Sequence, residues 1–128
     1  MCDFNTGFRE PEMVKRRPVF VLSPKITARI NLCTIIALST TPPEPIMPYH
    51  AIIKLPDNFP EWLREKQMWL KGDMIYTASF MRLDFIKSDK AKSGKRIYIY
   101  KPLDCETIKT VEKCVLNGIG LAGLTKYL

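Results

Sequence analysis

An arginine and three hydroxyl residues at the ends of two apolar segments are the side chains best suited to chemistry on a phosphate. Arg17 stands directly before a proline, and a residue in that position is held in an extended conformation. Its guanidinium offers a rigid fork of donors that fits phosphate oxygens. Ser39, Thr40 and Thr41 follow the next apolar segment. In adjacent antiparallel strands the start of one lies beside the end of the other, so we expect Arg17 and Thr40 to meet at one rim of a sheet.

A guanidinium and a hydroxyl on one phosphate would stabilise the charge that develops during phosphoryl transfer. RNA carries its own nucleophile, the 2′-hydroxyl, so such a site requires neither a metal ion nor a serine–histidine pair. The alternative interpretation is structural: the basic stretch 15–17 is then a solvated turn, and the two threonines are ordinary residues at a strand exit.

Other catalytic patterns are missing from the sequence. It contains no metal-binding box, no glycine-rich nucleotide loop and no nucleophile elbow, so we expect neither a metal nor a cofactor. The single histidine, His50, is interpreted as a structural or groove-wall residue rather than a general base. The four cysteines are scattered, which argues against a zinc site or a disulfide framework. Cys33 and Cys114 are expected in the core.

Length and charge limit the class of protein. A chain of 128 residues is expected to form one domain, 1–128, with a hydrophobic core of its own. Twenty Lys and Arg against thirteen Asp and Glu leave a net charge of +7, which favours a polyanionic partner. The sequence shows no secretory leader and no run of membrane-spanning length, so we expect a cytoplasmic protein that is not bound to a membrane.

Short strands followed by one helix make up the expected fold. The Val-, Ile- and aromatic-rich segments predict strands over residues 18–22, 32–38, 49–55, 74–77 and 96–100. Ser79 is expected to cap a short helix that ends at Phe85, and a helical turn is expected within 56–71. Asp104 is expected to cap the clearest helix, whose apolar residues at helical spacing are Ile108, Val111, Val115 and Ile119. The order of these elements predicts a mainly β fold, a small and strongly curved barrel with a C-terminal helix packed on it.

Two blocks of the sequence resemble the signature of the PemK/MazF toxin family. Residues 15–23, Lys-Arg-Arg-Pro-Val-Phe-Val-Leu-Ser, match its basic loop, Arg-Pro pair and valine-rich strand, and residues 35–41 match the following strand with its threonine-containing turn. The segments 49–50, 72–74 and 82–83 are similar to later blocks. The resemblance implies an SH3-like barrel that forms a homodimer and cuts single-stranded RNA without metal. It also implies a growth-inhibiting toxin that a cognate antitoxin neutralises.

The family's functional residues are carried over by position. Its catalytic arginine falls on Arg17 and its catalytic threonine on Thr40, with Thr41 in the alternative register. Cleavage would leave a 2′,3′-cyclic phosphate and a 5′-hydroxyl. The expected substrate-binding residues are Lys15, Arg16, Ser39, Thr41, His50 and Arg82.

Three features depart from the family pattern. The chain begins inside the expected first strand, the first loop carries Glu10 and Glu12, and the excursion 56–71 is long. The same fold also occurs in toxins that poison gyrase and cut nothing, because a fold does not determine an activity. A non-catalytic binding module of that kind and an inactive relative are therefore the alternatives. Substitution of Arg17 separates an RNA-cutting enzyme from a protein-binding poison.

Overall fold

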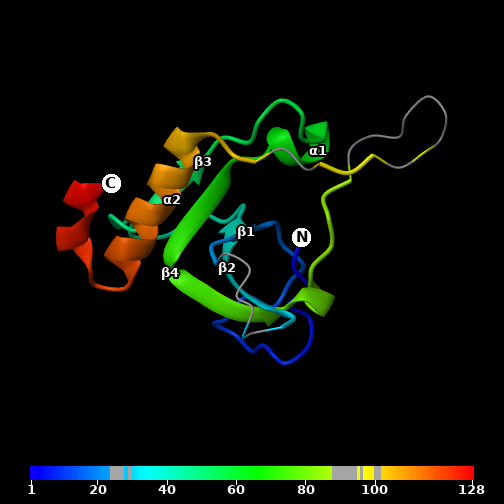
Figure 1. The fold of residues 1–128 in the computed structure, drawn as a ribbon, viewed down its shortest axis with the longest axis horizontal. Helices are drawn as coiled ribbons and strands as arrows, with labels where there is room; N and C mark the ends of the chain where they lie inside the picture. Colours follow the sequence, from blue (N-terminus) through cyan, green and yellow to red (C-terminus); the bar gives the residue numbers. More distant parts are fainter. Residues whose placement is uncertain (24–27, 29, 88–94, 96, 100–101) are drawn as a thin grey trace.

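The fold is built on one curved antiparallel sheet. The computed structural model describes residues 1–23, 28, 30–87, 95, 97–99 and 102–128. Within these residues the sheet has four strands, in the order β1-β2-β4-β3. The strands are β1 (Val19–Val21), β2 (Leu32–Ser39), β3 (His50–Ile53) and β4 (Met68–Ser79). The sheet curls into half of a barrel, which confirms the predicted mainly β fold (Figure 1).

Helical segments are few and mostly short. They are α1 (Glu61–Arg64), α2 (Cys105–Gly118) and the 3₁₀ turns η1 (Phe80–Arg82) and η2 (Ala122–Tyr127). The longest, α2, lies along the outside of β4 and β3 (Figure 1). Among the residues described, no helix combines the length and the apolar character needed to cross a membrane.

Strand β2 is buried on both faces, which explains its nearly continuous apolar sequence. Side chains alternate across a strand. Cys33, Ile35 and Ala37 accordingly lie in one apolar cluster, together with the N-terminal segment. Ile36 and Leu38 lie in a second cluster, which α2 covers. The strand therefore separates the two apolar clusters.

Strand β4 bends sharply in its middle (Figure 1). Ile36 of β2 pairs with Ile75, whereas Leu38 pairs with Leu70, so residues 71–74 stand opposite a single residue of β2. Extra residues in one strand of a pair bend it and increase its twist. The first half of β4 pairs with β3, and the second half continues along β2. The bend thus turns the corner of the half-barrel.

Helix α2 packs on the sheet through one face. Val111 and Cys114 are buried against the strands, as the spacing predicts for Val111 and the apolar context for Cys114. Ile108 and Ile119, which the same spacing placed on that face, remain 41% and 53% exposed. The helix ends at Gly118, and Ile119 is already its C-cap residue.

Asp104 caps the N-terminus of α2, as predicted. One carboxylate oxygen accepts a hydrogen bond from the Thr107 backbone N–H at 2.8 Å. This bond, with a second from the Thr107 hydroxyl, lowers the pKa of Asp104.

A lowered pKa adds stability above the ordinary pKa of an aspartate, and that stability is lost as the pH falls through the pKa of the folded state. We expect Asp104→Ala to lower the melting temperature by a few degrees near pH 7. The difference should narrow as the pH falls below the ordinary pKa of an aspartate, and equal melting temperatures near pH 7 would contradict the assignment.

Three secondary-structure predictions need correction. Strand β4 begins at Met68, not at 74, because the Lys-Gly-Asp sequence that resembles a turn forms the bend inside the strand. Ser79 does cap a helix, but it is a single 3₁₀ turn, since the chain becomes extended at Leu83 and bridges to Cys2. In the predicted strand 96–100, the residues described contain one bridge, between Tyr98 and Lys87. Most of residues 87–95, which precede this predicted strand, lie outside the described residues.

Candidate functional site

Arg17 lies at the entrance of β1, where the sequence placed it. Its backbone N–H and C=O bond the C=O and N–H of Cys2, at 2.9 and 2.6 Å, which holds the backbone extended. The antiparallel register of β1 with β2 sets Arg17 opposite Ser39, and an Arg17 Nη lies 3.5 Å from the Ser39 Oγ. The Arg17 Nε is buried and has no hydrogen-bond partner among the residues described. A buried donor without a partner is costly, so a ligand with an acceptor group for this N–H would stabilise the site.

The hydroxyl residues after β2 form a tight turn around Ser39. Ser39 is 2% exposed, and its Oγ accepts a hydrogen bond from the Thr41 backbone N–H at 3.1 Å. Thr41 lines the same cavity as Arg17 and Ser39. Thr40, the residue that the family resemblance favours, is exposed beside them and is not among the residues that line the cavity.

An open cavity of about 580 Å³ lies in front of Arg17. Lys15, predicted from the basic stretch, lines it, and so does Lys71 from the bend of β4. Among the described residues, three cationic ones thus line one cavity, which Thr41 also lines. Clustered cations with preset donors favour a phosphate, which has several oxygens for them to bind.

The loop between Phe8 and Lys15 forms another wall of this cavity and is held by contacts with Tyr76 of β4. Phe4, Phe8 and Tyr76 form a cluster of rings with centroids 5.1 to 5.6 Å apart. The Met13 backbone N–H donates to the Tyr76 hydroxyl at 3.3 Å. Burial raises the pKa of Tyr76, and the negative charge of Glu12 raises this pKa further. The loop is therefore anchored to β4 rather than free above the cavity.

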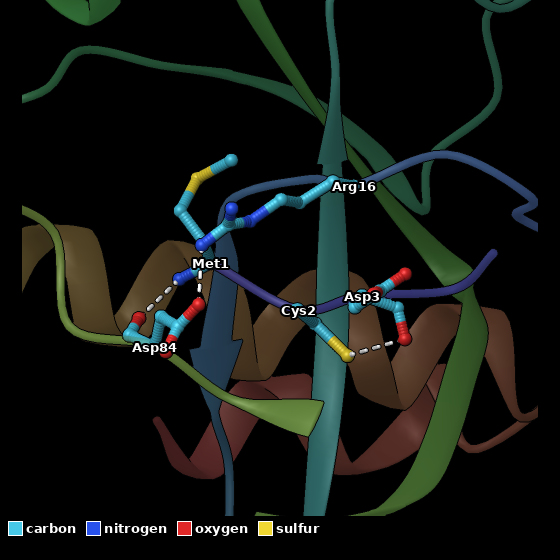
Figure 2. A network of polar contacts seen from close by, with 5 residues as sticks. All are labelled: Met1, Cys2, Asp3, Arg16 and Asp84. Carbon is cyan, nitrogen blue, oxygen red and sulfur yellow. Dashed lines mark hydrogen bonds and ion pairs between the residues drawn. The ribbon is translucent and has the colours of Figure 1, made fainter. Parts of the chain in front are cut away.

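Arg16, which was expected to bind substrate, is not among the residues that line the Arg17 cavity. Its guanidinium forms an ion pair with the carboxylate of Asp84, whose backbone oxygen accepts a hydrogen bond from the Met1 amino group at 2.9 Å (Figure 2). The pair joins the basic stretch to the segment after η1. Because neighbouring residues of an extended chain point to opposite sides, Arg16 and Arg17 cannot both face one cavity.

Arg82 and His50 also lie outside the lining of the Arg17 cavity. Arg82 donates to the Asp3 backbone oxygen at 3.1 Å and lies over the Phe8 ring, so it fastens the N-terminal segment. His50 accepts the Met47 backbone N–H on Nδ1 at 3.0 Å, which leaves Nε2 to carry the proton 3.7 Å from Asp73. These contacts agree with the structural interpretation of His50.

A second cavity, of about 470 Å³, is poorly suited to a phosphate. It lies beside β1 and is lined mainly by apolar side chains, among them Val19, Val21, Leu83 and Phe85. Of the described residues that line it, none is a lysine or an arginine. The Arg17 cavity is therefore the candidate functional site.

Sequence reasoning missed Lys71 and left Glu10 and Glu12 without a role. In the sequence, Lys71 is notable only for its place between an apolar run and a glycine. Its position at the cavity depends on the bend in β4. The two glutamates depart from the family pattern, and the structure places both on the cavity wall.

Comparisons with known proteins agree with this architecture. Among solved structures, the Mycobacterium tuberculosis toxin MazF-mt6 has a similar fold, with a TM-score of 0.54 and 15% sequence identity over 86% of this chain and 92% of that chain. A comparison with the curated proteins finds no match. The family model for the PemK-like, MazF-like toxin of type II toxin-antitoxin systems matches residues 1–116. Since that match spans the sheet, the Arg17 cavity and nearly all of α2, the chain belongs to the PemK-like, MazF-like toxin family.

Proposed function

We propose that this protein is an endoribonuclease toxin that cuts single-stranded RNA without a metal ion and leaves a 2′,3′-cyclic phosphate and a 5′-hydroxyl. The observation that supports this most strongly is the buried Nε of Arg17, which has no partner among the described residues, at a cavity that Lys15, Lys71 and Thr41 also line. Family membership supports the toxin role.

The reaction follows from these groups. The 2′-hydroxyl attacks the adjacent phosphorus and loses its proton, the bond from phosphorus to the 5′ oxygen breaks, and that oxygen takes up a proton. Negative charge grows on the non-bridging oxygens as the phosphorane forms. Arg17 stabilises this charge, a threonine hydroxyl of the 39–41 turn donates to a second oxygen, and Lys15 and Lys71 hold the flanking backbone.

The partners follow from charge and family. A net charge of +7 suits both RNA and an acidic, extended segment of a cognate antitoxin. We place the active protein in the cytoplasm as a homodimer, the setting that the family resemblance implies.

The test is incubation of purified protein with a long single-stranded RNA in EDTA. Discrete fragments with 5′-hydroxyl ends are expected. Intact RNA in the presence of folded protein would contradict the nuclease assignment and leave a non-catalytic toxin of the same fold.

The same assay assigns the hydroxyl group. We expect Thr40→Ala or Thr41→Ala to reduce cleavage about a hundredfold, since each variant loses one possible donor to the phosphorane. Only the residue that donates in the transition state should show this loss, whereas the other variant serves as its control. Full activity in both variants would remove the hydroxyl from the mechanism.

A further inference from the structure

Two carboxylates share the Arg17 cavity with its three cations. Glu10 and Glu12 both line it. A carboxylate close to a phosphate raises the energy of the complex, because like charges repel at short range. In a cavity that binds RNA, a carboxylate is therefore suited to the part of the nucleotide that carries N–H donors, which is the base.

Of the two carboxylates, Glu12 is held in place. Its Oε2 accepts the Arg9 backbone N–H at 2.6 Å, and its own N–H donates to the Arg9 oxygen at 2.8 Å. The next residue, Met13, is buried and bonds to Tyr76. Both glutamates are exposed, but in the described part of the chain no hydrogen bond or ion pair involves the Glu10 carboxylate. A fixed acceptor loses less freedom on binding and so discriminates better between ligands.

The four bases differ in the number of N–H donors that they offer to a fixed carboxylate. An ionised carboxylate only accepts hydrogen bonds. Guanine offers two adjacent donors on its Watson–Crick edge, N1–H and the N2 amino group, which match the two carboxylate oxygens. Adenine and cytosine offer one amino group each. Uracil has one N–H between two carbonyl oxygens, which the carboxylate repels.

Building on the proposed function, we propose that Glu12 is the specificity-determining residue of the cavity: it selects a nucleotide whose base donates from its Watson–Crick edge, guanine first, and rejects uracil. Single-stranded RNA exposes this edge to protein groups. The cations bind every nucleotide alike through its phosphate, whereas Glu12 discriminates between the bases.

Binding to oligomers that cannot be cut tests this proposal apart from catalysis. Fluorescently labelled heptamers of 2′-deoxyuridine, with dG or dU at the central position, lack the 2′-hydroxyl nucleophile. By fluorescence anisotropy we expect the wild-type protein to bind the dG heptamer about tenfold more tightly than the all-dU heptamer. In Glu12→Gln the amide oxygen keeps the Arg9 contact and an NH₂ group replaces the second acceptor. This variant should lose the preference for dG.

Glu10→Gln is the matched control, because it removes the same charge from the same cavity. It should bind both heptamers more tightly but keep the preference for dG. A wild-type protein without preference, or a Glu12→Gln variant that retains it, would overturn the proposal. The nuclease assignment is judged separately. If the protein cleaves RNA but Glu12→Gln keeps the preference for dG, only the role of Glu12 is refuted. If the preference depends on Glu12 but the protein does not cleave RNA, only the nuclease assignment is refuted.

Discussion

Replacing Arg17 with alanine is expected to reduce RNA cleavage about a hundred- to a thousandfold, the usual cost of removing one preset donor to a developing negative charge. The side chain is well placed for this role, since its Nε is buried without a partner in the described part of the chain and its Nη is only 3.5 Å from the Ser39 Oγ. The measurement is the rate of fragment formation from a single-stranded RNA in EDTA, together with a circular dichroism spectrum of each protein.

The loss should not come from unfolding. The contacts that fix Arg17 in the fold are its backbone bonds to Cys2, and alanine preserves them. Ser39 keeps its bond to the Thr41 backbone N–H. We therefore expect a melting temperature close to that of the wild-type protein, which separates a catalytic defect from a structural one.

Two further variants make the result specific. Arg17→Lys keeps the charge but loses the planar fork of donors, so most of the activity should still be lost. Arg16→Ala removes a neighbouring charge of the same sign, but its guanidinium is paired with Asp84 outside the Arg17 cavity, so cleavage should change little. If Arg16→Ala and Arg17→Ala lost activity equally, the effect would be one of net charge and the role of Arg17 would be refuted.

Sequence patterns predicted the elements whose stability is local or whose two faces are both buried. Strand β2 was evident because an apolar run with no turn residues suits a strand buried on both faces. Helix α2 was evident because Asp104 caps it and apolar residues follow at helical spacing. The juxtaposition of Arg17 with the end of β2 followed from antiparallel pairing alone, and the register confirms it.

The remainder of the site depends on long-range contacts that leave little trace in the sequence. Lys71 reaches the cavity only because β4 bulges opposite β2, and its Lys-Gly-Asp sequence is just as compatible with a turn. Glu12 reaches it because its loop is bonded to Tyr76, far along the chain. Arg16 was predicted to bind substrate, but its ion pair with Asp84 depends on where the segment after η1 lies.

The bend in β4 rests on a direct backbone contact with α2, and this contact leads to the second large prediction. A Cβ added at Gly72 would lie 2.2 Å from the Cys114 backbone oxygen, and one added at Gly118 would lie 2.3 Å from the Gly72 oxygen. Neither glycine is required for its backbone angles, so both are required for space alone. Two backbones this close cannot both give way without moving the helix off the sheet.

We expect Gly72→Ala to destabilise the protein by about 3 kcal/mol or more, measured as the shift of the urea unfolding midpoint at constant m-value. Gly118→Ala should have an effect of similar size, because it blocks the same contact from the other side. Gly123→Ala is the control: an added Cβ there meets nothing within 4 Å, so its midpoint should not fall. Equal midpoints for Gly72→Ala and Gly123→Ala would show that α2 does not hold the bend.

The same contact connects the stability of the fold to the chemistry of the site. Lys71 precedes Gly72 directly, so a displaced bend would move this cation away from Arg17 and enlarge the cavity. Any Gly72→Ala protein that remains folded under mild conditions should therefore bind single-stranded nucleic acid more weakly than the Gly123→Ala protein. No residue of α2 lines the Arg17 cavity, yet by fixing the corner of the half-barrel the helix determines where Lys71 stands.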